Sequence, residues 1–352
     1  MGTPDGGRGV LNARGKVEAA VIGVGHLGRH HARLMKEVPG AELVAVVESR
    51  EEQGRAVAAD LGVPWLPSAE ALPDSVRAVS VAVPTSLHHA VVCPLLERGV
   101  HVLVEKPMAA TLEEARAMAT LASDRGLVLQ VGHVERFNPA LSVMSKLKVQ
   151  PRFIEAARLA PFTYRALDVS VVMDLMIHDI DIVLQLAASP LVRVEAVGSH
   201  VLGKQVDIAN ARLTFGNGCV ANITASRVSF EPLRKTRVFG DDAFVTMDFA
   251  TRRAFVVRKA EGFDLGSLSP ESAAKLPPKP SFKEFVEQGI FDTKQIDMDA
   301  SNPLAEELSA FIAAVRGEDP PGGRPGVPAA DGLAAMEVAF QVSEQIRTHR
   351  WA

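Results

Sequence analysis

Hydrophobic residues in the first third of the chain form short continuous runs, separated by longer segments of mixed polarity. Such runs are typical of strands that are buried on both faces, and the segments between them have the length and spacing of amphipathic helices. The predicted strands are 17–22, 43–47, 78–83, 100–104 and 127–131, and the predicted helices are 29–37, 87–98 and 112–125. Strands that alternate with single helices indicate a parallel sheet with helices on both faces.

The pattern changes after residue 135. A short helix at 140–147 and a strand at 152–159 are followed by a long apolar helix at 169–188. Gly216-Asn217-Gly218 further along predicts a hairpin turn, so the strands around it should form an antiparallel-rich sheet. Those predicted strands are 192–202, 206–215, 219–228, 234–239, 244–249 and 253–257.

The segment 260–302 is rich in Pro and polar residues and is predicted to be a long loop with one brief helix around 282–288. Two helices, 303–316 and 329–347, follow it. A chain of 352 residues is too long for one ordinary core. We therefore predict an α/β fold with three parts: a disordered tail at 1–15, a Rossmann domain with a doubly wound parallel sheet at 16–135, and an α+β domain with an open antiparallel-rich sheet at 136–352.

The long apolar helix carries one narrow polar stripe, formed at helical spacing by Asp174, His178, Asp181 and Gln185. Charged groups on a buried helix need partners, so we expect the stripe to line a polar cavity. A histidine with a carboxylate one turn to either side can act as a catalytic base. The alternative is a structural histidine held by Asp174.

Composition excludes several classes of protein. The net charge of −4, without a basic run, argues against a nucleic-acid surface. Cys93 and Cys219 stand in no metal-ligand or redox spacing, as expected in a reducing cytoplasm. The first residues lack the apolar core of a signal peptide, and no apolar run is long enough to cross a membrane. We therefore expect a cytoplasmic protein with no metal, nucleic-acid or membrane partner.

The first predicted strand runs directly into the motif Gly23-Val24-Gly25-His26-Leu27-Gly28, and a helix follows. In this setting Gly23 makes the tight turn, Gly25 admits a pyrophosphate and Gly28 allows the helix to approach the strand closely. The amino terminus of the helix attracts the phosphates. The motif therefore predicts a dinucleotide site, with His26 and Leu27 as further contacts.

Glu48 ends the second predicted strand, 20 positions after the glycine motif. An acid at this place can bond both ribose hydroxyls and repel a 2′-phosphate, so NAD is favoured over NADP. Arg50 lies close enough in sequence to weaken that preference.

In sheets of this kind, ligands bind beyond the carboxyl ends of the strands. Lys106 follows one strand end and is held extended by the proline after it. In an apolar cleft such a lysine can orient or deprotonate a substrate hydroxyl, whereas a surface lysine in a turn is the alternative. The cofactor contacts predicted at strand ends are Pro84, Thr85, Glu105, Lys106 and Pro107, and the substrate contact predicted there is His133.

The glycine motif, Glu105-Lys106-Pro107, and the pair Asp174 and His178 followed by Asp181 together resemble the Gfo/Idh/MocA family of NAD(P)-dependent oxidoreductases. The resemblance implies that Lys106 is the active-site lysine and that Asp174 and His178 are the catalytic carboxylate and histidine. It also implies that Pro107 shapes the nicotinamide site and is a candidate for a cis peptide bond. Members of this family use the open sheet for dimer or tetramer contacts.

Within the family, residues 132–139 and 174–181 are similar to the UDP-N-acetylglucosamine 3-dehydrogenase branch. That branch supplies a 3-keto sugar nucleotide to an aminotransferase in the synthesis of lipid A precursors. A UDP-sugar substrate needs cations for its diphosphate and donors for its acetamido group. Beside His133 and the catalytic residues, the substrate contacts expected are Arg136, Asn138, Arg158, Tyr164 and Arg165. For each arginine the alternative is an ordinary ion pair, and Tyr164 is equally suited to packing.

The implied reaction is the NAD-dependent oxidation of a secondary CH–OH group. His178 is the preferred base for the hydroxyl proton, Asp174 orients His178, and Lys106 bonds the hydroxyl oxygen. The reverse assignment, with Lys106 as the base and His178 as the orienting group, is nearly as well supported. One rival is a dehydrogenase of another substrate: a UDP-sugar uronate, an inositol or a free sugar. Another is a dinucleotide-binding regulator without turnover.

Overall fold

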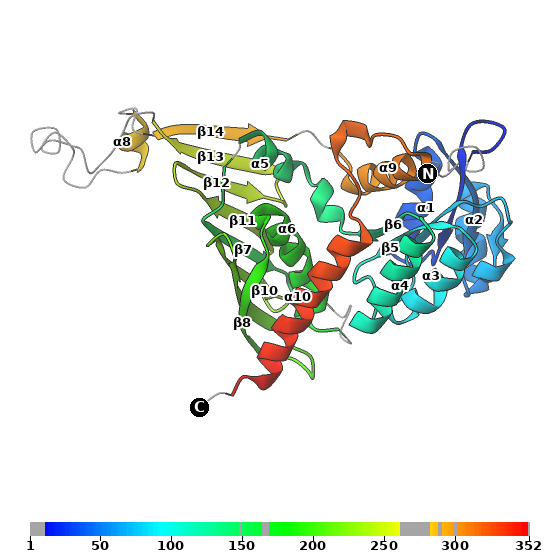
Figure 1. The fold of residues 1–352 in the computed structure, drawn as a ribbon, viewed down its shortest axis with the longest axis horizontal. Helices are drawn as coiled ribbons and strands as arrows, with labels where there is room; N and C mark the ends of the chain where they lie inside the picture. The colour runs from blue at the N-terminus through cyan, green and yellow to red at the C-terminus, as the bar shows by residue number, and fades with distance from the viewer. Residues whose placement is uncertain are drawn as a thin grey trace, which may run out of the picture. The chain divides into compact units, whose positions relative to one another are not determined.

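The computed structural model describes residues 11–147, 149–163, 169–260, 282–287, 291–298 and 301–350. The chain forms two compact units, which Figure 1 shows in the colours of the sequence. Unit 1 comprises Met1–Phe137, Ile180–Ile182 and Ser301–Gln341, and unit 2 comprises Asn138–Asp179, Val183–Ala300 and Val342–Ala352.

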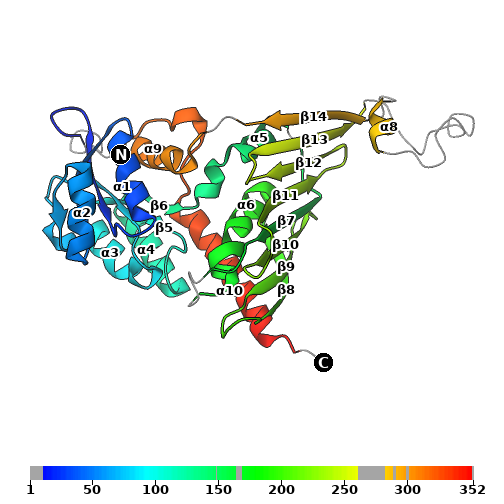
Figure 2. The same cartoon turned by 180° about the vertical axis from the view of Figure 1, so that it is seen from behind.

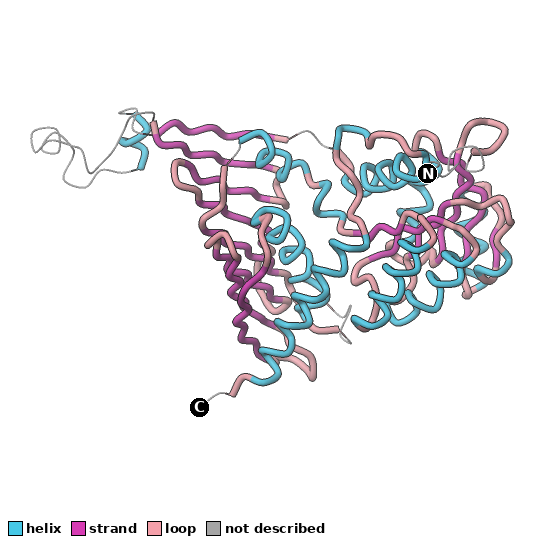
Figure 3. Tube along the Cα trace, in the orientation of Figure 1, coloured by secondary structure: helices cyan, strands magenta, loops and turns pink. Residues whose placement is uncertain are grey.

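Unit 1 is built on a parallel sheet of six strands in the order β3-β2-β1-β4-β5-β6. Figure 3 shows strands in magenta and helices in cyan. The strands are β1 Val17–Ile22, β2 Ala41–Val47, β3 Trp65–Leu66, β4 Ala78–Val81, β5 His101–Glu105 and β6 Leu129–Gly132. The order reverses at β1, as in a doubly wound sheet. The predicted parallel sheet is thus confirmed, with β3 added at one edge.

Helices complete unit 1. They are α1 Gly28–Glu37, α2 Glu51–Leu61, α3 His88–Glu97, α4 Leu112–Asp124, α9 Pro303–Arg316 and most of α10 Ala329–Thr348, with the short turns η1 Ala69–Ala71, η2 Thr85–Leu87, η3 Val134–Phe137 and η7 Pro321–Gly323. The sequence analysis missed α2. Only Gly54 and Ala58 of α2 are buried, so its sequence lacks the apolar stripe on which helix prediction depends.

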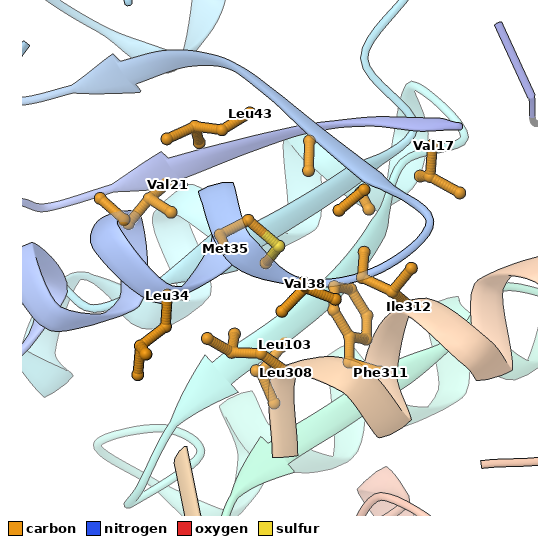
Figure 4. Close-up of a cluster of buried hydrophobic side chains, with 14 of the residues drawn as sticks. Val17, Val21, Leu34, Met35, Val38, Leu43, Leu103, Leu308, Phe311 and Ile312 are labelled. Carbon is orange, nitrogen blue, oxygen red and sulfur yellow. The ribbon is translucent and has the colours of Figure 1, made fainter. Parts of the chain in front are cut away.

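The first segment of unit 1 ends at Phe137, close to the predicted boundary at residue 135, and α9 also belongs to unit 1. Leu308, Phe311 and Ile312 of α9 join the buried cluster that contains Met35 of α1 and Val21 of β1 (Figure 4). Burying each such side chain stabilises the fold by about 1.5–3 kcal/mol. A disordered tail was predicted for residues 1–15, but residues 11–15 form a turn in the structure, and the Asn12 side-chain amide donates to Glu42. Residues 1–10 lie outside the described residues.

Unit 2 is built on an eight-stranded sheet in the order β14-β13-β12-β11-β7-β10-β9-β8. The strands are β7 Phe153–Leu159, β8 Leu191–Ser199, β9 Ile208–Phe215, β10 Val220–Ser226, β11 Leu233–Phe239, β12 Ala243–Asp248, β13 Arg253–Lys259 and β14 Phe291–Asp297. The predicted hairpin turn joins β9 to β10, with Gly218 at φ +83°. All neighbours are antiparallel except β7 and β10, which are parallel; the chain between them includes η5, α6 and the strands β8 and β9.

Strand β14 corrects the prediction of a long loop at 260–302. Its sequence is largely polar and its residues are half-buried or exposed, so no apolar alternation marks it as the edge strand that pairs with β13. The brief predicted helix near it is α8, Phe282–Glu287. The remaining parts of that segment, 261–281, 288–290 and 299–300, lie outside the described residues.

The predicted helix at 169–188 has two parts. A π-helical turn, η5 Val172–Met176, leads into α6, Ile177–Ala187, which lies along one face of the unit 2 sheet (Figures 1 and 2). The buried positions of β10, Ala221, Ile223 and Ala225, alternate along the strand as expected when one face is covered. A 3₁₀ turn and a helix, η4 Pro139–Leu141 and α5 Ser142–Leu147, open unit 2.

Among the helices that the structure describes, none is both long enough and apolar enough to cross a membrane.

Candidate functional site

The segment Gly23–Gly28 of unit 1, here called the glycine loop, requires glycine at specific positions. A Cβ atom at Gly28 would lie 1.7 Å from the carbonyl oxygen of Gly23, so α1 can approach the loop only without a side chain there. Gly23 has φ +80°, and a Cβ atom on it would lie 2.8 Å from Val83. At Gly25 the nearest atom would be 3.9 Å away, on Arg50. The loop is therefore close-packed beneath and open at Gly25, as required for a pyrophosphate.

The amino terminus of α1 is suited to an anion. Its N-cap residue, Leu27, makes no side-chain cap, and the first turn of α1 contains no acidic residue. His26 and Leu27 lie in the loop before the helix, and half of the Leu27 surface is exposed. Backbone N–H groups and the helix dipole at this end favour phosphate. The residues of unit 1 thus fit NAD, the group that would bind here.

Glu48 points back towards the glycine loop. Its Oε2 accepts the Val24 N–H at 3.1 Å, and its Oε1 accepts from the N–H and Nε of Arg50, each at 3.2 Å. Glu48 is only 7% exposed, whereas two thirds of the Arg50 side chain is exposed. The carboxylate therefore lies beside the loop that would hold the cofactor, as expected for an acid that binds the ribose.

The turn from Glu105 to Pro107 follows β5, and the Lys106–Pro107 peptide is cis. Glu105 Oε1 lies 3.0 Å from His31 Nε2, and Glu105 Oε2 accepts the Lys106 backbone N–H at 3.2 Å. Burial alone would raise the pKa of Glu105, but the His31 bond and the neighbouring Lys106 bring it below the usual value. The Lys106 side chain itself is half-buried.

A second histidine, His88, contacts the other end of this turn. It opens α3, directly after Pro84 and the short turn that begins at Thr85. Its Nδ1 is 2.9 Å from the carbonyl oxygen of Pro107. Neither His31 nor His88 was predicted from the sequence as a site residue. The available signal was the presence of a histidine within each of two helices that pack on the sheet.

Arg136 and Asp181 form a buried ion pair within unit 1. Arg136 Nη2 and Nε lie 2.6 and 2.8 Å from the two carboxylate oxygens of Asp181, and Nη1 lies 2.7 Å from Asp331. The two carboxylates offset the effect of burial and raise the pKa of Arg136. His133 is 1% exposed, and burial lowers its pKa. The Arg136 guanidinium, predicted to contact substrate, is thus engaged by two aspartates of its own unit.

Two further substrate candidates have structural partners in unit 2. The buried Arg158 donates to both oxygens of Asp179, at 2.8 and 3.1 Å, so its guanidinium is engaged internally. Asn138 accepts the Ala140 N–H and thereby caps η4, and its amide donates to the Phe249 carbonyl oxygen. The other two candidates, Tyr164 and Arg165, lie outside the described residues.

The polar stripe on the predicted helix is divided in the structure. Asp174 lies in the π turn and His178 in the first turn of α6, and both side chains are half-buried. Asp181 is buried in its ion pair, and Gln185 is exposed. The members of the stripe therefore meet different surroundings. A π turn inside a helix is frequent at functional sites, and Asp174 lies within this one.

The proposed catalytic residues belong to two units: Lys106 to unit 1, and Asp174 and His178 to unit 2.

Comparisons with known proteins agree with these features. Residues 17–133 match a family model described as "Oxidoreductase family, NAD-binding Rossmann fold", and residues 149–246 match the "GFO/IDH/MocA C-terminal domain". The chain is 37% identical over 305 residues to UDP-N-acetylglucosamine 3-dehydrogenase of Acidithiobacillus ferrooxidans, covering 86% of this chain and 90% of that relative. A solved structure of that enzyme matches with a TM-score of 0.80 at 34% identity, covering 94% of this chain and 98% of the other.

A second relative acts on a different substrate. The chain is 30% identical over 234 residues to scyllo-inositol 2-dehydrogenase (NAD(+)) of Bacillus subtilis, covering 61% of this chain and 68% of that relative. Together with the glycine loop and the two matched domains, these relatives show that the chain belongs to the Gfo/Idh/MocA family of oxidoreductases and that its first domain is an NAD-binding Rossmann domain.

Proposed function

We propose that the protein oxidises the 3-hydroxyl of UDP-N-acetylglucosamine to a 3-keto sugar nucleotide. The observation that supports this substrate most is the 37% identity to UDP-N-acetylglucosamine 3-dehydrogenase, which extends over nearly the whole of both chains. The relative that acts on scyllo-inositol is matched over a smaller share of this chain. The 3-keto product would then go to an aminotransferase, in the cytoplasm, as a step towards lipid A precursors.

In the proposed mechanism, NAD⁺ held by the glycine loop and Glu48 would supply the hydride acceptor for the sugar carbon. The hydroxyl proton leaves to His178, while Asp174 orients the imidazole and the Lys106 ammonium bonds the same oxygen. Lys106 also stabilises the negative charge that develops on that oxygen. Exchange of roles between Lys106 and His178 is the second form of this proposal, since both groups act on one hydroxyl.

For the substrate, we propose contacts from His133, Asn138, Tyr164 and Arg165. We leave out Arg158 because its guanidinium is engaged by Asp179 within the core of unit 2. We propose a supporting role for Arg136 rather than binding of the diphosphate, since its guanidinium pairs with Asp181 and Asp331.

We also propose that the protein is a homodimer or homotetramer through the sheet of unit 2. On β8 and β9, the apolar side chains Val192, Val197 and Ile208 are exposed, by 68, 38 and 37% respectively. Exposed apolar side chains on adjacent strands favour contact with another copy of the sheet.

The test is incubation of the protein with NAD⁺ and UDP-N-acetylglucosamine while NADH absorbance is followed, with a hydrazine present to trap the ketone. Parallel incubations contain scyllo-inositol, a UDP-sugar uronate and glucose. We expect NADH to form fastest with UDP-N-acetylglucosamine. Faster turnover of an inositol would overturn the substrate, and NAD binding without turnover of any of these alcohols would support a regulator instead.

A further inference from the structure

The turn that carries Lys106 is held from both sides by buried histidines. His31 of α1 contacts the residue before Lys106, and His88 of α3 contacts the residue after it. Each histidine is 1% exposed. Two imidazoles from helices far apart in the sequence therefore converge on one three-residue turn.

His31 acts through Glu105. A carboxylate can only accept hydrogen bonds, so His31 Nε2 donates to Glu105 Oε1 across 3.0 Å. The other ring nitrogen, Nδ1, lies 2.8 Å from the Ser80 hydroxyl of β4, which sets the direction of the ring. The second oxygen of Glu105 accepts the backbone N–H of Lys106. The chain of contacts thus runs from Ser80 to the backbone of Lys106.

Glu105 has little freedom to leave this arrangement. A Cβ atom on Gly132 of β6 would lie 3.1 Å from Glu105 Oε1, so a side chain at residue 132 would crowd the carboxylate and require a shift of a few tenths of an ångström. The Glu105 side chain is 13% exposed. The direction of the carboxylate is therefore set by protein contacts and not by solvent.

His88 fixes the other end of the turn. Its Nδ1 lies 2.9 Å from the Pro107 carbonyl oxygen and its Nε2 lies 3.0 Å from the Val83 carbonyl oxygen. A neutral imidazole donates from one nitrogen only, so one of these two carbonyl contacts is a hydrogen bond, and the ring lies between the turn and the chain beyond β4. Burying an imidazole costs free energy unless its nitrogens are bonded, and an apolar side chain would fill the same space without that cost. The polar contacts of both rings are accordingly explained by placement of the turn rather than by stability.

We propose that His31 and His88 are positioning residues that hold the Glu105–Pro107 turn from both sides and so set the location of the Lys106 ammonium. The proposal rests on the role proposed above for Lys106. Displacement of a catalytic group by about 1 Å can lower the rate about 100-fold. Loss of either imidazole is therefore expected to lower kcat while the protein remains folded and binds NAD.

The experiment compares His31→Ala, His31→Gln, His88→Ala and His88→Gln with the parent protein. For the alanine variants we expect kcat to fall by about 10- to 100-fold, while KM for the sugar nucleotide and Kd for NAD⁺ by calorimetry change less than about threefold. Glutamine retains an amide donor, so His31→Gln and His88→Gln should recover part of the loss. The glutamine variants also keep the test valid if an alanine variant fails to fold.

A second readout requires neither NAD nor substrate. The Lys106 amide N–H is bonded to Glu105, so His31→Ala should accelerate its hydrogen exchange by about tenfold or more. The matched control is His101→Asn. His101 begins the same strand and accepts the Val128 N–H at 3.0 Å, a bond that asparagine can replace. This control should change neither kcat nor exchange at Lys106.

The outcomes separate the two proposals. If Lys106→Met abolishes turnover but the alanine variants at 31 and 88 keep the parent kcat and Lys106 exchange rate, the positioning role is overturned and the proposed mechanism stands. If Lys106→Met retains turnover, the role of Lys106 in the proposed function fails, whereas faster exchange in His31→Ala would still show that the turn is held as described.

Discussion

Arg136 Nη2 lies 2.6 Å from Asp181 Oδ1, and this buried pair joins η3 to the three residues of α6 that belong to unit 1. Asp181 is three positions after His178 on the same helix. The pair therefore helps to fix the helix that carries the proposed base.

The first prediction concerns this pair. Asp181→Ala would leave Arg136 with a buried charge that Asp331 alone offsets, so the free energy of unfolding should fall by about 3–5 kcal/mol. Urea denaturation followed by circular dichroism measures this. The control is Gln185→Ala, an exposed residue one turn further on, for which a change below about 0.5 kcal/mol is expected. Equal effects of the two substitutions would contradict the account.

The second prediction concerns Glu307 of α9, which is 1% exposed. Among the residues that the structure describes, neither of its carboxylate oxygens has a hydrogen-bond partner. Burial raises the pKa of Glu307 well above the usual value, and the charges of Glu105 and Asp181 raise it further. Glu307 should therefore be a neutral acid in the folded protein, and replacing it with Met should raise the free energy of unfolding at pH 7 by about 1–3 kcal/mol.

The pH dependence of that gain has a definite sign. Above the ordinary glutamate pKa of about 4.3, the unfolded chain releases the proton that folded Glu307 keeps, so the free energy of unfolding falls as pH rises towards the raised pKa. Glu307→Met removes this fall, and its advantage should shrink as pH is lowered to about 4. Urea midpoints at several pH values measure it, with the exposed Glu113→Gln as control. An advantage that grows at acid pH would refute the neutral acid.

The third prediction concerns His133, whose pKa is lowered by burial. Below the ordinary histidine pKa of about 6.5 the unfolded chain binds a proton that folded His133 does not, so the free energy of unfolding should fall as pH decreases. His133→Gln should reduce this acid sensitivity, whereas the exposed His200→Gln should leave it unchanged. Unfolding curves between pH 5 and 7.5 give both slopes; parallel slopes for parent and His133→Gln would count against the assignment.

The fourth prediction concerns the choice of cofactor. Glu48→Ser removes the carboxylate beside the glycine loop. It also releases Arg50, whose Nε–H group donates a hydrogen bond to that carboxylate at 3.2 Å. A hydrogen bond to a charged group contributes about 1.5–3 kcal/mol, so its loss should lower the affinity for NAD⁺ by about 10- to 100-fold. The preference for NAD⁺ over NADP⁺ should therefore decrease. The ratio of kcat/KM for the two cofactors measures this. Glu52→Gln, at an exposed site on α2, should preserve the parent ratio.

The fold could be predicted from the sequence where burial produces a clear pattern of apolar residues along the chain. The runs that became β1, β4 and β5 are apolar because both faces of the parallel sheet are covered, and the glycine loop was visible because each glycine meets a steric limit. The capping box of Thr111 and Glu114 at α4 shows the same consistency between sequence and structure.

The parts that were missed have weak patterns or depend on distant partners. Strand β14 is polar because it lies at a sheet edge, and α2 buries only two small residues. Helix α9 belongs to unit 1 because Leu308 and Phe311 join the core of that unit. The periodicity of a helix shows only that one of its faces is buried, not which core covers that face.

In the candidate site, sequence alone could indicate that Arg158 and Asp181 carry charge, but not which groups would neutralise them. It could likewise not show that His31 meets Glu105, because those residues are 74 positions apart and converge only through the arrangement of α1 on the sheet. Residue types were therefore predictable, and the pairs they form were not.

NADH formation from UDP-N-acetylglucosamine by the parent protein and by two variants, Lys106→Met and His178→Ala, tests the roles proposed for these two side chains. Removal of a catalytic acid or base typically lowers the rate about 10²–10⁴-fold, and we expect losses of that size for both variants while each still binds NAD⁺ by calorimetry. The exposed Lys204→Met and His200→Ala serve as matched controls and should keep the parent kcat. Turnover by either catalytic variant at the parent rate would contradict the account.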